Sequence, residues 1–262
     1  MDRENALNEA RAKNAETEQR KAWEGEQRRA AGTTSEPLLG KFTQDDVIRA
    51  AGAIEDNSSM WLASAWDARK DAIVALAFHP TEFGYEVKQL DPRLFVLQET
   101  SGKLAPVAQT KLDLSHANCS NDSGEPAGGW SDAPKFALDL GACEVTPGQT
   151  AVGVRLTCMY TFPAGQGIET RLYLAELKDG TLRQIFEAMM AREDFQRPAA
   201  TWGTTHGVLA VQPTQHAGYF DLELRSEFNL RYENPEAGKP SQRTRTERFV
   251  WIDNHYSPAH VR

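Results

Sequence analysis

The segment Ile73-Val-Ala-Leu-Ala-Phe78 decides the fold class of this chain of 262 residues. It is apolar throughout, and the polar run Asp67–Asp71 comes before it. A short apolar run of this kind, with β-branched and aromatic members, is typical of a strand buried on both faces. From Met60 onward the apolar residues recur with a period of two. We therefore expect a mainly β protein with antiparallel sheets.

The order of these elements recurs further along the chain. Val152 corresponds to Val74, and Leu172 corresponds to Leu94, at the same offset of 78 residues. A looser third copy contains the alternating segment Tyr219–Leu230. We predict tandem four-stranded units arranged as a partial propeller or as a β-sandwich. The predicted units span residues 58–114, 136–195 and 205–258.

Three short segments have features other than the strand pattern. Thr43 can cap a short helix near residues 44–55, because Asp45 and Asp46 suit its first turn. A strand that ends at Phe186 is expected to pass into a helical turn from Met189 to Phe195, since these apolar residues also fit one helical face. In the third copy we expect a strand at Val208–Val211 and a turn at residues 212–218.

The first 35 residues form a charged arm rather than part of the β domain. They are rich in Ala, Glu, Arg, Lys and Gln, and their only large apolar residues are Leu7 and Trp23. Such a segment is either a single solvated helix or a disordered arm, and it is either a tether or an inert tail. We expect residues 36–262 to form a single β-rich domain.

Charge and hydropathy exclude several classes of protein. The formal net charge is −8 and the pI is near 5.4, which argues against a nucleic-acid binder. No stretch approaches the roughly 18 consecutive apolar residues of a membrane-spanning helix, so we expect no membrane insertion. The N-terminus lacks the apolar core of a secretory signal, although a removed signal would leave the same sequence.

The chain has three cysteines: Cys119, Cys143 and Cys158. If Thr146–Gln149 turns a hairpin, Cys143 and Cys158 lie too far apart along the two strands to form a bridge. Of these two pairs Cys119–Cys143 is the more plausible, but free buried thiols are the default expectation, and the pairing stays open. The cysteines and the tether-like arm favour a periplasmic or otherwise extracytoplasmic location, and a cytoplasmic one stays open.

The segment from Ser115 to Pro134 is the strongest candidate for a binding site. Gly, Ser, Asn, Asp and Pro dominate it, and long loops in compact domains are usually functional or disordered. We predict a recognition loop with an aromatic anchor, or else a lid whose tryptophan packs on its own sheet. The partner-binding candidates are Asp122, Glu125, Trp130 and Asp132.

Metal, cofactor and catalytic motifs are weak in this sequence. Residues 121–125 lack the ligand spacing of an EF-hand, and His116 with Cys119 and Cys143 is a poor zinc set. None of the six histidines lies in a signature context. We therefore expect no cofactor and no metal. An enzyme would use His116 or His206 with Asp122 or Asp132.

The run from Arg243 to Arg248 alternates along a strand near the C-terminus. Arg243, Arg245 and Glu247 share one face of that strand. A basic edge can attract an acidic partner, but charge on an exposed edge also discourages aggregation, and we favour the second role.

These observations lead to a hypothesis about function. We expect a non-enzymatic protein that binds another protein, as an extracytoplasmic bacterial inhibitor, immunity or assembly factor. The alternatives are a hydrolase with a site near residues 115–134 and a structural module of a secretion or surface assembly. A large exposed apolar patch would favour the structural module.

Overall fold

The computed structural model describes residues 37–51, 60–79, 90–117, 134–162, 165–196, 201–233 and 238–259. Within these ranges the chain forms one short helix and twelve strands, all paired antiparallel in two sheets. The prediction of a mainly β protein with antiparallel sheets is confirmed. The predicted arm, residues 1–35, lies outside the described residues.

The smaller sheet contains four strands in the order in which they occur along the chain. Its second strand is buried at all seven positions, as the segment Ile73–Phe78 predicts. The reason is that both faces of the sheet are covered, one by the larger sheet and one by the helix. The strands are β1 (Met60–Ala65), β2 (Ala72–Phe78), β3 (Arg93–Thr100) and β4 (Lys103–Lys111).

The helix α2 (Gln44–Ala50) starts where the sequence predicts. Thr43 caps it through a capping box, in which the Asp46 backbone N–H donates to the Thr43 hydroxyl and the Thr43 backbone N–H donates to the Asp46 carboxylate. Val47 is fully buried against the small sheet. The helix is shorter than predicted, because Ala51 is its C-cap, and residues 52–59 lie outside the described ranges.

The larger sheet is an eight-stranded meander in which every strand pairs with its neighbours in sequence. Two-residue turns with positive φ at both positions close three of its hairpins, at residues 179–180, 217–218 and 253–254. Positive φ at both positions is the signature of the tight turns that match strand twist. The strands are β5 (Lys135–Thr146), β6 (Gln149–Phe162), β7 (Gly165–Lys178), β8 (Thr181–Gln196), β9 (Thr201–His216), β10 (Tyr219–Tyr232), β11 (Ser241–Ile252) and β12 (His255–Pro258).

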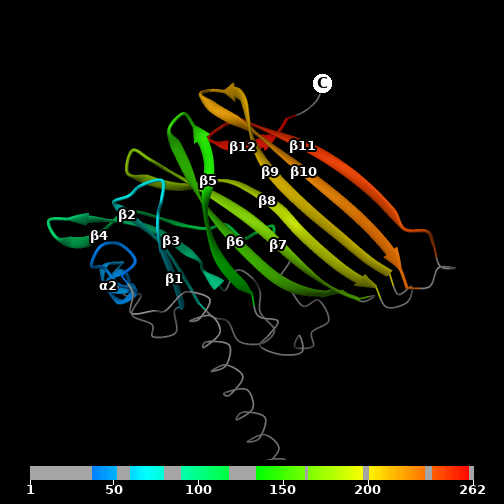
Figure 1. Cartoon of the computed structure of the whole chain (residues 1–262), viewed down its shortest axis with the longest axis horizontal. Coiled ribbons are helices and arrows are strands. Elements are labelled where there is room, and N and C mark those ends of the chain that lie inside the picture. The colour runs from blue at the N-terminus through cyan, green and yellow to red at the C-terminus, as the bar shows by residue number, and fades with distance from the viewer. Residues whose placement is uncertain are drawn as a thin grey trace, which may run out of the picture.

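Two cores shape the larger sheet. One lies between the sheets, where Val74 and Leu76 of β2 belong to the same cluster as Val152 and Val154 of β6. The other forms because the larger sheet curls at one end, so that β10 contacts β5 and β12 contacts β8 without pairing. At the opposite end β8 to β11 extend away from the small sheet (Figure 1).

The three predicted units each contain four strands, namely β1–β4, β5–β8 and β9–β12. The turn at Ser101–Gly102 and the turn at Asp179–Gly180 both have positive φ at each position, as the predicted offset implies. However, the second and third groups of strands belong to one continuous sheet. That these groups are sequence repeats stays a prediction.

Two segments that we expected to turn continue instead as strand. The predicted helical turn Met189–Phe195 is wrong, because β8 runs without a break to Gln196. Register shifts in the pairing of β7 with β8, at Thr170/Arg171 and Leu174/Ala175, add residues to β8. These bulges change the period-two spacing into one that resembles a helix. The predicted turn at 212–218 is also too long, since β9 continues to His216.

The structure describes two of the three cysteines. Cys143 is a free thiol, which excludes the Cys119–Cys143 pair. Cys158 is disulfide-bonded, with a partner outside the described residues. Cys143 pairs with Ala151 beside the turn that follows β5, so it does lie far along the ladder from Cys158, as expected. Burial, together with the nearby Asp139, raises the pKa of the Cys143 thiol to about 11.

Candidate protein-interaction face

Residues 118–133 of the predicted recognition loop lie outside the described residues. Asp122, Glu125, Trp130 and Asp132 all lie outside the described residues. The part of the chain that the structure describes contains a different exposed aromatic group, at the far end of β8 and β9. We refer to it as the aromatic face and define it by Ile168, Phe195, Trp202 and Val208.

Strand register places these four side chains on one side of the larger sheet. Phe195 pairs with Trp202, and Trp202 pairs with Arg231 of β10. Ile168 pairs with Glu193, which lies two residues before Phe195 and therefore on the same side. Val208 lies on this side as well, three alternations along β9 from Trp202.

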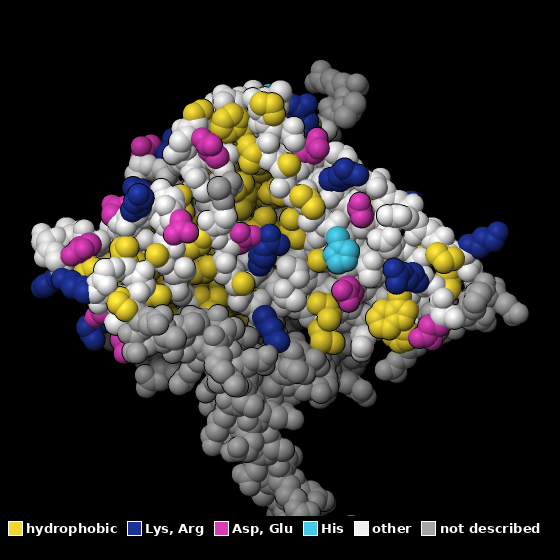
Figure 2. All heavy atoms as spheres, in the orientation of Figure 1, with side chains coloured by type: hydrophobic (Ala, Val, Ile, Leu, Met, Phe, Trp, Pro, Cys, Tyr) yellow, Lys and Arg dark blue, Asp and Glu magenta, His cyan; other side chains and the backbone are white. Residues whose placement is uncertain are grey.

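Three members of the aromatic face are exposed although they are large and apolar, and Phe195 is half-buried. The exposed fractions are 43% for Trp202, 40% for Ile168 and 67% for Val208. The rings of Phe195 and Trp202 lie 4.6 Å apart between centroids, so each ring restricts the other. Hydrophobic side chains reach the surface over this end of the sheet (Figure 2).

The chemistry of the aromatic face resembles that of a binding surface. Aromatic residues and arginine are enriched at protein interfaces, and ordered tryptophans often contribute most of the binding energy. Arg231 is the neighbour of Trp202, and Arg225 is the neighbour of Val208. The apolar side chains of the face could therefore anchor a partner, and the neighbouring arginines would surround them with polar groups.

The sequence signal for this face is weak. Phe195 and Trp202 are placed symmetrically around Pro198-Ala199, in a segment that suits a hairpin loop. A hairpin there would pair the two aromatic residues. The predicted helical turn from Met189 to Phe195 would not pair these two residues, whereas the strand β8 does.

The histidines of the catalytic hypothesis are not brought together. His116 contacts Glu187, with Nδ1 2.7 Å from a carboxylate oxygen. The pKa of Glu187 is raised overall, because the effect of burial outweighs the opposing effects of the nearby His116 and Arg171. His206 lies on β9 opposite Glu227 and is exposed. Their proposed partners Asp122 and Asp132 lie outside the described ranges.

A different histidine makes the closest approach to a catalytic arrangement. His216 Nδ1 lies 2.5 Å from a carboxylate oxygen of the buried Asp221. The Thr214 hydroxyl donates to the other oxygen of the same carboxylate at 2.7 Å, and Arg248 donates to it as well. Burial alone would raise the pKa of Asp221, but these hydrogen bonds lower it. In a catalytic triad the hydroxyl instead contacts the second ring nitrogen.

His255 has the complementary arrangement. Its Nε2 lies 2.9 Å from the Ser257 hydroxyl, but its Nδ1 contacts a backbone carbonyl, that of Asp253, on an exposed hairpin. Neither His216 nor His255 therefore has a hydroxyl on one ring nitrogen and a carboxylate on the other.

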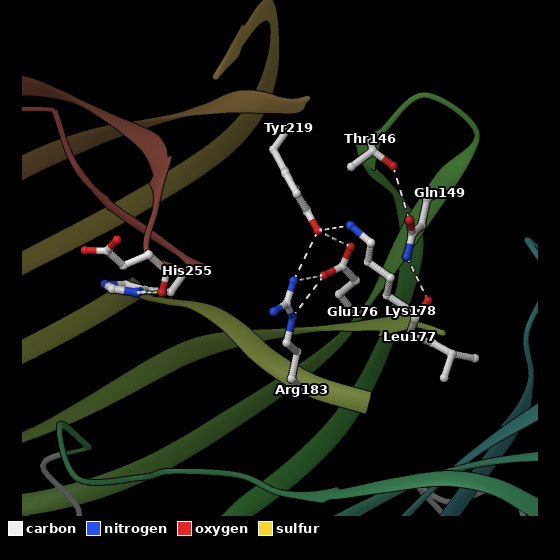
Figure 3. A network of polar contacts seen from close by, with 9 residues as sticks. Thr146, Gln149, Glu176, Leu177, Lys178, Arg183, Tyr219 and His255 are labelled. Carbon is white, nitrogen blue, oxygen red and sulfur yellow. Dashed lines mark hydrogen bonds and ion pairs between the residues drawn. The ribbon is translucent and has the colours of Figure 1, made fainter. Parts of the chain in front are cut away.

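The curled end of the larger sheet contains a buried polar network (Figure 3). The Glu176 side chain is fully buried, and it accepts a hydrogen bond from the Tyr219 hydroxyl at 2.6 Å. Arg183 donates to its other oxygen at 2.9 Å. The Tyr219 ring stacks on Trp251 with centroids 3.5 Å apart. These contacts join β7 and β8 to β10 and β11, so the network holds the curled end closed.

The described residues contain no group of three or more histidine, cysteine, aspartate or glutamate side chains that could hold a metal ion. No helix in the described ranges has the length and apolar character needed to cross a membrane.

Comparison with known proteins identifies no relative of this chain. No family model, no curated protein and no solved structure matches it.

Proposed function

We propose that the protein binds another protein through the aromatic face and that it is not an enzyme. The observation that carries the proposal is the pair Phe195–Trp202, held on a regular strand pair and 43% exposed at Trp202. Exposing such a ring costs hydrophobic free energy, and an interface can recover it. His216 and His255, which have the closest contacts to a carboxylate or a hydroxyl, do not form a triad that would favour the enzyme alternative.

Replacing Trp202 by Ser tests this role. Loss of an aromatic anchor of this kind costs about 2 kcal/mol or more in binding, which is roughly a thirtyfold change in affinity. The full-length variant and the wild-type chain are immobilised, exposed to extract of the native organism, and compared by quantitative mass spectrometry of the captured proteins. We expect a defined set of proteins to be lost from the variant.

Ile252→Ser is the matched control. Ile252 is 45% exposed, close to the value for Trp202, but it lies on β11 beside the turn to β12. Protein capture should be unchanged in this variant. The free energy of unfolding of both variants should stay within about 1 kcal/mol of the wild-type value. Equal capture by the Trp202→Ser variant and the wild type would contradict the proposal.

We also propose an extracytoplasmic location and a role as an inhibitor, immunity or assembly factor. The disulfide at Cys158 supports an oxidising compartment, since disulfides persist there and are rare in the cytosol. A binding surface on a β-sheet suits a protein that acts by binding its partner.

Thiol counting tests the compartment. Because Cys143 is free and Cys158 is bonded, denatured protein purified from the native organism without reductant should take up one alkyl group per chain. After reduction it should take up three, the number of cysteines in the sequence. Mass spectrometry distinguishes the two states. Three labelled thiols before reduction would contradict an oxidising compartment.

A further inference from the structure

We propose that the free edge of β11 binds an extended acidic segment of a partner protein, which adds a strand to the larger sheet. Strand addition to an exposed edge is a known mode of peptide recognition, in which backbone hydrogen bonds supply affinity. The inference rests on the proposed role in protein binding, and it specifies the partner's chemistry and how the partner is held.

The geometry of β11 leaves half of its edge open. β12 pairs with it only from Phe249 to Ile252, and the Ala259 N–H donates to the Arg248 carbonyl at 2.7 Å. In antiparallel strands the N–H and C=O of one residue point to the same side, and successive residues alternate. The Arg248 carbonyl points away from β10, and the pairing of β10 with β11 is regular. The same outward direction therefore holds for Thr246, Thr244 and Gln242.

This edge is accessible along its length. All residues from Ser241 to Thr246 are exposed. Within the described ranges no strand pairs with the outer side of this segment. Its unpaired N–H and C=O groups are a ready template for another extended chain.

The charge of the edge selects the partner. Arg243 and Arg245 lie on one face of β11, opposite the face of Thr244. Arg245 donates to Glu247 at 2.7 Å in an exposed ion pair, whereas Arg243 makes no ion pair within the described residues. On an added strand the residues directly opposite lie about 5 Å away between Cβ atoms. Two acidic residues, two positions apart, would face both arginines.

The net charge of the chain does not oppose this contact. The formal charge is −8, but charges in solution are screened beyond about 8 Å at physiological salt. The arginines on the edge therefore determine the interaction at contact distance.

A second copy of this chain is a poor occupant. A symmetric antiparallel pair centred on Arg243, Thr244 or Arg245 would place an arginine opposite an arginine, and like charges in that position are destabilising. Symmetric registers centred beyond Arg245 need the Arg248 carbonyl, which Ala259 already uses. Registers centred on Ser241 or Gln242 pair three residues of β11 at most, because the strand begins at Ser241. The edge therefore favours a different, acidic chain.

Fluorescence anisotropy with defined peptides tests the proposal on the full chain. The probe is a labelled seven-residue peptide that alternates threonine and glutamate, with both termini blocked, and the comparison peptide has lysine in place of glutamate. We expect the glutamate peptide to bind at least about tenfold more tightly, since each arginine faces a carboxylate. Equal affinity for the two peptides, or no binding of the glutamate peptide at millimolar concentration, would overturn the proposal.

Two variants separate edge pairing from simple charge attraction. Thr244→Pro removes an outward N–H and leaves the hydrogen bonds to β10 in place, so affinity should fall about tenfold. Thr244→Val keeps the N–H and should stay within about twofold of wild type. Unchanged binding by folded Thr244→Pro protein would overturn strand addition.

The charge variant keeps the proposal testable if Thr244→Pro does not fold. Replacing both Arg243 and Arg245 by Glu should reverse the preference, so that the lysine peptide binds more tightly than the glutamate peptide. An unchanged preference would overturn the proposal. A second outcome would also overturn it: if the wild-type chain sediments as a dimer and the double substitution alters that dimer, the edge binds a second copy of the chain. If peptide binding fails while capture still depends on Trp202, the edge inference fails and the aromatic face stands.

Discussion

Replacing Glu176 by Ala should lower the free energy of unfolding by about 3–5 kcal/mol, because it leaves a buried hydroxyl and a guanidinium without their acceptor. Glu176 is fully buried and accepts hydrogen bonds from Tyr219 and Arg183. For a domain of this size the loss corresponds to about 10 °C in melting temperature. Chemical denaturation followed by circular dichroism measures it.

A matched control and a second substitution locate the effect. Glu193→Ala, at an exposed position on β8, should change stability by less than about 0.5 kcal/mol. Arg183→Ala should cost much less in the Glu176→Ala background than in the wild type, because the shared contact is already lost. Additive losses would show that the two side chains act separately and that the network does not hold the curled end closed.

Replacing Tyr173 by Phe should have the opposite sign and stabilise the protein by about 1–3 kcal/mol. Tyr173 is 0% exposed between the two sheets, and its hydroxyl has no hydrogen-bond partner among the described residues. Burial also raises the pKa of this hydroxyl, which therefore stays protonated at neutral pH. Removing a buried polar atom without a partner removes its desolvation cost.

Tyr219→Phe is the matched substitution for this second prediction. The same atom is removed, but the Tyr219 hydroxyl contacts Glu176, Lys178 and Arg183, so stability should fall by about 1–2 kcal/mol. Thermal unfolding of the two variants under one buffer makes the comparison. A decrease for Tyr173→Phe would mean that its hydroxyl is satisfied and would contradict the prediction.

Local features of the fold were predictable from residues close together in sequence. The run Ile73–Phe78 is apolar at every position and is buried at every position. The cap at Thr43 also follows from short-range chemistry. The sequence pattern failed at β8, because two bulges there change the spacing of apolar residues, and bulges depend on the partner strand.

The candidate site was less predictable than the fold. The sequence drew attention to Trp130, in a segment that lies outside the described residues, whereas the aromatic face depends on the register between β8 and β9. Register brings Phe195 beside Trp202 and sets Arg231 next to them. Alternation along the sequence shows which residues share a face with Trp202, but it does not show which face of the strand is exposed to solvent.

By itself, the sequence determined the class of the protein: antiparallel strands, their tight turns, the capped helix and a net negative charge. Only the tertiary structure decided that β5 to β12 form one sheet, that this sheet curls at one end, and that one edge of β11 stays open. The physical reason is the range of the forces involved. Side-chain alternation and turn geometry act over a few residues, whereas strand pairing and burial depend on contacts between segments far apart in the chain.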